Sequence, residues 1–109
     1  MPDVAWAELV PGVRVRRLVD DANGLVMGEL EIDPGQEMPW HRHNVQEGVV
    51  VVAGHGEASM PQVVIELGPG QGAVFPATTP HRMRNVGESV LRLVFSFPAA
   101  QVTREWLEC

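Results

Sequence analysis

Glycine and proline interrupt this sequence so often that a long helix has no room to form. The 109 residues include 11 Gly and 9 Pro, and both residue types weaken or end helices. Between these interruptions lie short apolar runs in which valine is frequent, such as residues 49–52, and valine favours strands because its branched side chain packs well on a pleated surface. The pattern predicts an all-β fold, a barrel or a sandwich. A chain of this length builds one hydrophobic core, so residues 1–109 are interpreted as a single domain.

Nine strands are expected, each bounded by turn-forming residues. Two turns are strong signals, residues 33–35 (Asp-Pro-Gly) and 68–70 (Gly-Pro-Gly), because proline and glycine favour the backbone angles of tight turns. The segment 101–108 is expected to be a short tail, helical or extended, with helical character indicated by the spacing of four between Val102 and Trp106. The expected strands span residues 13–19, 24–33, 37–43, 46–53, 57–60, 62–67, 73–76, 81–86 and 90–97.

The charged residues exclude several partners and mechanisms. The formal net charge is −6 and all eight cations are arginine, so neither nucleic acid nor a membrane surface is expected as a partner, because phosphate binding depends on basic clusters. A chain without lysine cannot form a lysine Schiff base. The single cysteine, Cys109, cannot form an intrachain disulfide. Residues 1–10 carry no basic residue and no apolar run approaches the roughly 20 residues of a membrane span, so the cytoplasm is the expected location.

His41 and His43 are the first indication of chemistry. Residues two apart on a strand point to the same face, so both imidazoles project together. Glu47 follows a bend near Asn44 and can bring a carboxylate to the same place, and His81 supplies a third imidazole from a later strand. Three imidazoles and one carboxylate suit a divalent transition metal, namely Mn, Fe, Co, Ni, Cu or Zn. We therefore predict a mononuclear metal site formed by these three histidines and Glu47.

The spacing of these residues resembles the two motifs of the cupin family. The second motif has Thr78 at a position where the family pattern has glycine, a departure that touches no ligand. The resemblance implies a double-stranded β-helix, a jelly-roll-like barrel with the metal in its mouth, and a homodimer. The first motif is met by Gly35, His41, His43, Glu47 and Gly54, and the second by Gly70, Pro76, His81 and Asn85.

A narrower resemblance concerns the two ends of the chain. Segments 6–16 and 103–107 resemble the ends of small cupins related to the tautomerases that process uronates in pectin degradation. This resemblance implies that Arg104 binds a substrate carboxylate. That group has a catalytic aspartate on the last long strand, and Leu93 occupies the corresponding position here. Glu29 is a candidate general acid or base on the condition that its side of the strand faces inward.

Three functions remain compatible with the sequence. The first is a metalloenzyme acting on a small oxygenated acid, sugar acid or enol, through isomerase, tautomerase or lyase chemistry or, with iron or copper, as a dioxygenase. The second is a non-catalytic cupin that binds a small ligand. The third is a barrel whose metal is purely structural, as a closed tetrahedral zinc site is. The first is favoured, with a small anionic substrate, because these ligands leave a divalent ion with a net charge of about +1.

Overall fold

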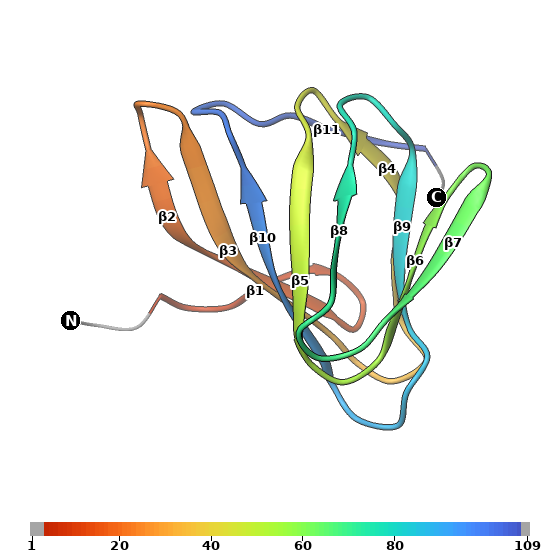
Figure 1. Cartoon of the computed structure of the whole chain (residues 1–109). Helices are drawn as coiled ribbons and strands as arrows, with labels where there is room; N and C mark the ends of the chain where they lie inside the picture. The colour runs from red at the N-terminus through yellow and green to blue at the C-terminus, as the bar shows by residue number, and fades with distance from the viewer. Residues whose placement is uncertain (1–3, 108–109) are drawn as a thin grey trace.

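The computed structural model describes residues 4–107, which form two β-sheets that face each other (Figure 1). The six-stranded sheet has the order β1-β2-β3-β10-β5-β8 and the five-stranded sheet the order β11-β4-β9-β6-β7. Neighbouring strands pair antiparallel. The strands are β1 (Ala7–Val10), β2 (Val13–Asp21), β3 (Leu25–Ile32), β4 (Glu37–His43), β5 (Glu47–Ala53), β6 (Gly56–Met60), β7 (Val63–Leu67), β8 (Gly72–Phe75), β9 (His81–Asn85), β10 (Leu91–Phe97) and β11 (Arg104–Trp106).

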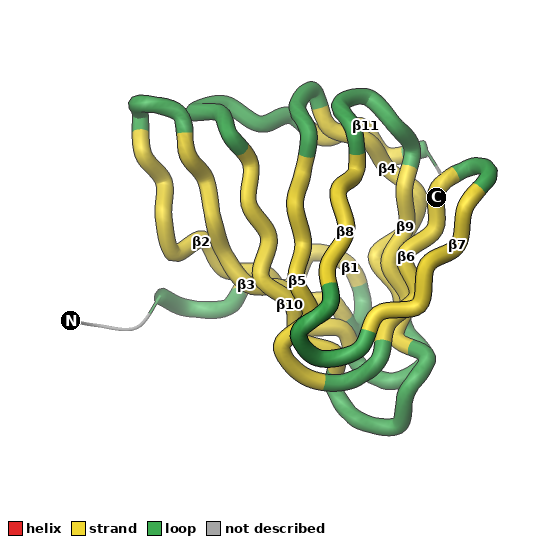
Figure 2. The backbone as a smooth tube through the Cα atoms, viewed as in Figure 1, coloured by secondary structure: helices red, strands yellow, loops and turns green. Residues whose placement is uncertain are grey.

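The all-β expectation is confirmed. The nine predicted strands are present as β2 to β10, with ends within two residues of the expected positions. Figure 2 shows these strands as long extended segments, with the loops gathered at the two ends of the barrel. The short strand β1, which was not predicted, extends the six-stranded sheet by pairing with β2. Within residues 4–107 no helix has the length and apolar character needed to cross a membrane.

The C-terminal tail is extended, and the helical interpretation of segment 101–108 is wrong for the part that the structure describes. Residues 104–106 form β11 and pair with β4, so that Arg104 lies opposite His43 and Trp106 lies opposite His41. The pairing covers one edge of β4 and satisfies backbone groups that an edge strand leaves open.

The spacing that favoured a helix is equally compatible with a strand. Side chains four residues apart share one face of a helix, and they also share one face of a strand, since its period is two. Val102 and Trp106 therefore could not distinguish the two conformations. The partner strand decides between them, and this partner is distant in the sequence, since Arg104 pairs with His43. Glu108 and Cys109 lie outside the described residues.

Alternating side chains fill the space between the sheets. On β3, Val26, Leu30 and Ile32 point inward and are buried, while Glu29 and Glu31 lie on the outer face. The same alternation on the other strands builds one continuous core, which burial of apolar surface stabilises. The core consists of Val13, Val26, Leu30, Ile32, Met38, Val49, Val51, Ala58, Leu67, Phe75, Met83, Leu91, Leu93, Phe95 and Phe97.

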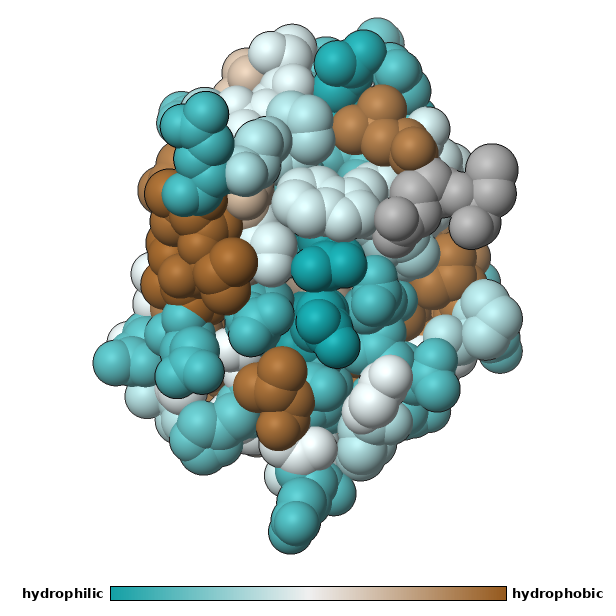
Figure 3. All heavy atoms as spheres, turned by 90° about the vertical axis from the view of Figure 1, so that its right-hand side faces the viewer, coloured by the Kyte–Doolittle hydropathy of each residue, from teal (hydrophilic) through white to brown (hydrophobic). Residues whose placement is uncertain are grey.

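The outer face of the five-stranded sheet is polar over its centre. Figure 3 shows hydrophilic side chains in the middle of this face and hydrophobic ones toward its margins. Arg82 and Arg84 point outward from β9, where they lie 3.8 Å from carboxylate oxygens of Glu37 and, for Arg84, of Glu57. These two arginines therefore face away from His81.

The asparagine of the second motif, Asn85, has a structural task at the end of the barrel opposite the histidines. Its Nδ2 donates hydrogen bonds to the carbonyl oxygens of Ile32 and Ser89, both at 2.8 Å, and its Oδ1 accepts one from the Gly87 backbone N–H at 2.9 Å. Asn85 is buried, so these bonds satisfy a group that would otherwise be costly to bury. It thereby fixes the loop between β9 and β10 against β3.

Candidate metal centre

Four polar side chains converge inside the end of the barrel where β4 turns into β5 and β8 into β9, the upper end in Figure 1. His41 and His43 both point inward from β4, Glu47 begins β5, and His81 begins β9. Each side chain is buried, with at most 9% of the residue exposed. The four possible ligand atoms all lie within 4.8 Å of one another. The structure thus brings together the four residues that the sequence predicted as metal ligands.

Backbone carbonyl groups fix the orientation of all three imidazoles. Each ring uses Nδ1 in a hydrogen bond to a carbonyl oxygen, which requires a proton on Nδ1 and points Nε2 toward the other ligands. Ligating histidines are commonly held in this way by an outer acceptor. The acceptors are Pro39 for His41 at 2.6 Å, Thr103 for His43 at 3.0 Å, and Thr79 for His81 at 3.0 Å.

Burial favours the neutral form of His41 and His43. It lowers the pKa of His41 to about 3, an effect that the neighbouring His81 reinforces. Burial also lowers the pKa of His43, against the opposing influence of Glu47. The Glu47 carboxylate lies between the rings, with Oε1 at 3.1 Å from Nε2 of His81 and 3.6 Å from Nε2 of His43. At neutral pH His41 and His43 are therefore neutral imidazoles, the form that binds a metal.

The turn between β8 and β9 supports two of the ligands. Thr78 has φ = 64°, the left-handed region that glycine adopts without strain, and it occupies the position where the cupin pattern has glycine. Its backbone N–H donates to the carbonyl oxygen of His43 at 2.8 Å. The next residue, Thr79, supplies the carbonyl that holds His81. These hydrogen bonds hold the turn in the same geometry although the residue is threonine. The left-handed conformation costs a residue with a Cβ about 1–2 kcal/mol.

The chemistry of this donor set fits a divalent transition metal. Three imidazole nitrogens and one carboxylate oxygen converge, and Glu47 is the one hydrogen-bonding partner on the rings' inner side among the described residues. Aromatic packing adds rigidity: the ring of Phe75 stacks on His81 with centroids 4.1 Å apart and planes 6° from parallel, and Phe97 meets His43 edge-on at 4.8 Å. His41, His43, Glu47 and His81 are the residues that would hold the ion.

A small apolar pocket adjoins these four residues. The space open to the centres of water molecules is about 40 Å³, enough for only a few water-sized groups. Besides the three histidines, the polar side chains that line it are Glu47 and Arg104. Leu93 lines the pocket too, and it is almost fully buried. Glu47 is thus the one carboxylate among the described residues of the pocket lining. The apolar part of the lining is Val15, Leu30, Met38, Val49, Phe75, Met83, Leu93, Phe95 and Phe97.

Arg104 is the one arginine whose charge has no carboxylate at ion-pairing distance within residues 4–107. The other seven each lie beside an aspartate or glutamate. Burial lowers the pKa of Arg104, with Glu47 and Arg17 acting in opposite directions on it, and its guanidinium lies 5.3 Å from the centre of the Trp106 ring. An arginine in such a place keeps its proton and is available to an anion that enters from outside.

Comparison with known proteins assigns the family. A model of the cupin domain matches residues 28–97. The chain belongs to the cupin family. SchB of Streptomyces halstedii is 39% identical to this cupin over 70 residues, a stretch that makes up 63% of this chain and 51% of SchB. The match therefore spans about half the length of that relative.

Solved structures share the fold of this cupin. The polyketide cyclase RemF from Streptomyces resistomycificus has a TM-score of 0.82 and 23% identity, over 98% of this chain and 82% of RemF. KdgF from Halomonas sp. has a TM-score of 0.74 and 22% identity, over 86% of each chain. These likenesses confirm the double-stranded β-helix that the motifs implied.

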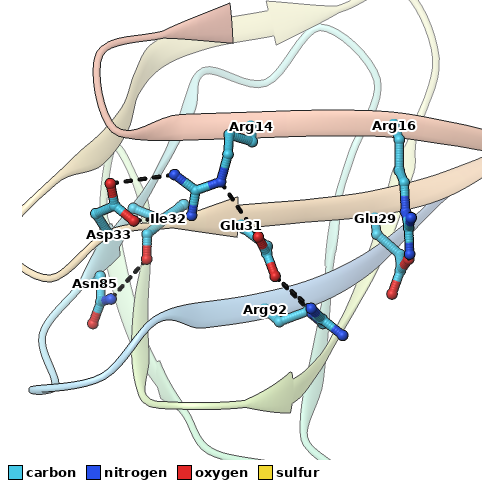
Figure 4. A network of polar contacts seen from close by, with 8 residues as sticks. All are labelled: Arg14, Arg16, Glu29, Glu31, Ile32, Asp33, Asn85 and Arg92. Carbon is cyan, nitrogen blue, oxygen red and sulfur yellow. Dashed lines mark hydrogen bonds and ion pairs between the residues drawn. The ribbon is translucent and has the colours of Figure 1, made fainter. Parts of the chain in front are cut away.

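Two further residues, Arg104 and Glu29, were candidates for a catalytic or substrate-binding role, and the structure places them differently. Arg104 lies at the pocket, whereas Glu29 does not. Glu29 lies on the outer face of β3, where its Oε1 accepts hydrogen bonds from Arg16 at 2.6 and 2.9 Å (Figure 4). The condition attached to Glu29, an inward-facing side chain, is not met. Leu93 does face inward, so the position of the missing aspartate is part of the pocket wall.

Two residues that hold the site were missed by sequence reasoning. Thr103 acts through its backbone carbonyl, which any residue type provides, so no sequence signal exists for it. Asn44 binds the C-terminal segment on both sides of Val102: its Nδ2 donates to the carbonyl of Gln101 at 3.1 Å and its Oδ1 accepts from the backbone N–H of Thr103 at 2.7 Å. Its place directly after His43 was visible in the sequence, but its partners lie almost 60 residues away.

Proposed function

We propose that this cupin is a metal-dependent enzyme that converts a small 3-oxo acid, or a related enolisable acid, through its enol form. One observation carries the proposal: Arg104, without an internal carboxylate partner in the described chain, adjoins four converging metal-ligating side chains in an apolar pocket. A barrel that used its metal only to fasten strands has no need of a pocket or of an arginine kept for an external anion. The arrangement therefore favours an enzyme over a structural metal site.

Each part of the pocket has a chemical task in this proposal. Arg104 binds the carboxylate of the acid, since a guanidinium matches a carboxylate in two parallel hydrogen bonds. The apolar walls exclude water and so strengthen electrostatic interactions inside. The three imidazoles and Glu47 hold the ion, which when bound supplies Lewis acidity toward a carbonyl oxygen.

Leu93 guides the choice among enol-forming reactions. Glu47 is the single carboxylate of the described pocket lining, and as a ligand of the ion it is not free to act as a base. We therefore favour substrates that reach the enol form without a separate protein carboxylate, as 3-oxo acids do when they lose carbon dioxide, over sugar acids from which a carbon-bound proton must be removed. RemF, which shares the fold, is a polyketide cyclase, and polyketides are chains of enolisable carbonyl groups.

Acetoacetate, a small 3-oxo acid, provides the test. The protein is loaded with one equivalent of Mn²⁺, Fe²⁺, Co²⁺, Ni²⁺, Cu²⁺ or Zn²⁺, and carbon dioxide release and deuterium uptake at C2 are followed by NMR in heavy water. At least one metal form is expected to exceed both the metal-free protein and the free ion. The reaction is run with and without oxygen, because turnover that persists without oxygen separates this chemistry from that of a dioxygenase.

Matched arginine variants test the role of Arg104. Replacing Arg104 by Gln removes a charge-assisted interaction worth about 1.5–3 kcal/mol, so kcat/KM for acetoacetate is expected to fall roughly 10- to 100-fold. Replacing Arg84 by Gln, on the outer face beside Glu37 and Glu57, is expected to leave kcat/KM unchanged. Equal kcat/KM in R104Q and the native protein, or no turnover with any of the six metals, contradicts the proposal.

A further inference from the structure

A second hollow continues from the metal pocket toward the surface. This outer groove lies between β1 and β2 on one side and the segment leading into β11 on the other, and it offers about 290 Å³ to the centres of water molecules. It shares Val15, His43, Phe95, Phe97 and Arg104 with the metal pocket. The two spaces are therefore adjacent parts of one site, of which the inner part is much the smaller, at about 40 Å³.

The inner pocket admits only the reacting end of a substrate. Its space corresponds to a few water-sized groups, which suffices for a carboxylate and a neighbouring carbonyl group. Any further part of the molecule must extend past Arg104, which lines both spaces. The lining of the outer groove consequently selects the chemical nature of a substrate tail that enters it.

The outer groove is lined by five apolar residues and four polar ones. Leu9 comes from β1, and Val102 precedes β11; both pack against the hydrophobic core. Apart from the shared His43 and Arg104, its polar side chains are those of Arg17 and Thr103. A sugar chain carries a hydroxyl on almost every carbon, and burying those hydroxyls without partners is costly. The groove matches an alkyl or aryl group instead.

Two positive charges face this groove from opposite sheets. Arg17 lies on β2 and Arg104 on β11, and the charge of Arg17 acts to lower the pKa of Arg104. Arg17 has a partner in Asp20 at 3.6 Å, but both side chains are about half exposed. Asp20 therefore neutralises little of the positive field at the mouth of the groove. The entrance therefore attracts an anion, while the walls between the charges bind apolar surface.

We propose that the outer groove binds an apolar tail of several carbons, so that the substrate is a 3-oxo acid with an alkyl or aryl substituent and not a sugar acid. This inference rests on the proposed function for the identity of the reacting end. It assigns Leu9 and Val102 as specificity-determining residues, which contact the tail and not the reacting atoms.

Binding of saturated fatty acids tests the groove without any turnover. Acetate, butyrate, hexanoate and octanoate are titrated into the Zn²⁺-loaded protein by calorimetry, with glucuronate as the sugar acid. Burial of each added methylene group is expected to tighten binding up to roughly fourfold until the groove is filled. Glucuronate is expected to bind no more tightly than acetate.

A matched pair of valine variants locates the effect. Replacing Val102 by Asn places a polar group in the groove and is expected to remove most of the gain from acetate to octanoate, with the acetate Kd unchanged. Replacing Val86 by Asn, a half-exposed valine in a loop outside the groove, is expected to keep the full gain. Circular dichroism and one equivalent of bound zinc establish that both variants are folded.

The outcomes separate this inference from the proposed function. Chain-length-dependent binding that V102N loses, together with no turnover of acetoacetate, supports the groove and overturns the enol chemistry. Equal affinity for acetate and octanoate overturns the groove, even where acetoacetate is turned over. Equal chain-length dependence in V102N and the native protein, or tighter binding of glucuronate than of octanoate, likewise overturns it.

Discussion

Two regions of this cupin gather charged and titratable side chains from several strands. They differ in how completely these side chains pair with one another. On the outer face of β2, β3 and β10, every arginine is paired with a carboxylate of the same chain (Figure 4). At the barrel mouth, three imidazoles and one carboxylate share an apolar pocket with Arg104, which has no carboxylate at ion-pairing distance among the described residues. The first region completes its interactions internally, whereas the second leaves them open to an ion and an anionic molecule.

The outer network shows what complete pairing does to titratable groups. Glu31 lies between Arg14 and Arg92, and Arg14 also donates to both oxygens of Asp33, at 2.9 and 3.2 Å. Burial acts to raise the pKa of Glu31, but the hydrogen bonds from Arg92 and Arg14 outweigh it and the pKa is lowered. The hydrogen bond from Arg14 lowers the pKa of Asp33. In this region the charged forms of the carboxylates are stabilised.

At the mouth the balance is reversed, since burial is the largest influence on each shifted group. It lowers the pKa values of His41, His43 and Arg104, and no carboxylate restores them fully. Groups with such shifts in a pocket are typical of functional sites. The mouth of the barrel thus buries polar side chains that pair incompletely with one another, whereas the outer face pairs its charges in full.

The largest expected effect is the loss of the metal. Replacing His81 by Ala removes one of three nitrogen ligands, so elemental analysis of the purified variant is expected to find no stoichiometric metal, against about one equivalent in the native protein. Replacing His55 by Ala is the matched control, because His55 is exposed in the loop between β5 and β6. A full equivalent in folded H81A would show that the four residues do not form the ligand set.

The second prediction concerns the pH dependence of stability in the metal-free protein. The pKa of His41 is about 3 in the folded chain against 6.5 ordinarily, so between these values the unfolded chain binds more protons. Stability is therefore full above about pH 6.5 and falls as the pH drops toward 3, by up to about 1.4 kcal/mol per pH unit for this group. Lowering of the His43 pKa acts in the same direction.

Urea unfolding at pH 7, 6 and 5 measures this slope. The variant H41N is expected to have a shallower slope than the native protein, and H55A an unchanged one. The outer network titrates in a separate window, because the lowered pKa values of Glu31 and Asp33 mean that its contribution is lost only as the pH falls below their ordinary values of 4.5 and 3.8. A slope that is the same in H41N and the native protein contradicts the neutral, buried state of His41.

The third prediction concerns Asn44, which links the mouth to the C-terminal segment. Replacing Asn44 by Ala removes the bonds to Gln101 and Thr103 and so loosens the carbonyl that orients His43. Loss of such outer support typically weakens metal binding roughly 10- to 100-fold, and competition with a chelator measures the Zn²⁺ affinity. Asn23→Ala, in an exposed turn, is expected to bind Zn²⁺ like the native protein. An unchanged affinity in N44A removes Asn44 from the support of the site.

Much of the site was predictable because its rules are local. His41 and His43 share a face since a strand has a period of two, and the alternation of Val26, Leu30 and Ile32 on β3 places Glu29 outside. These assignments need only the phase of each strand. The strand ends were predictable for a similar reason, because turn-forming residues bound them.

The rest depends on contacts between distant segments. The position of Arg104 follows from the pairing of β11 with β4, which a spacing of four between Val102 and Trp106 does not reveal. The carbonyl of Thr103 that holds His43 is backbone and has no sequence signature. The pairing of Arg14 with Asp33 joins β2 to the turn that follows β3, and it depends on the register of the two strands. Such features become visible only once the sheets are assembled.

The smallest expected effect comes from the outer network itself. Arg92 is 44% exposed at its side chain and donates to Glu31 at 2.9 Å, but Glu31 keeps a second partner in Arg14. Replacing Arg92 by Gln is therefore expected to lower the free energy of unfolding by less than about 1 kcal/mol, as for other exposed ion pairs, and by less still at high salt. Urea unfolding at low and high ionic strength measures this, and the Zn²⁺ affinity is expected to stay unchanged. A loss above about 2 kcal/mol, or weaker Zn²⁺ binding, would mean that the outer network and the mouth are coupled through β10 rather than separate, and the contrast between the two regions would then have to be abandoned.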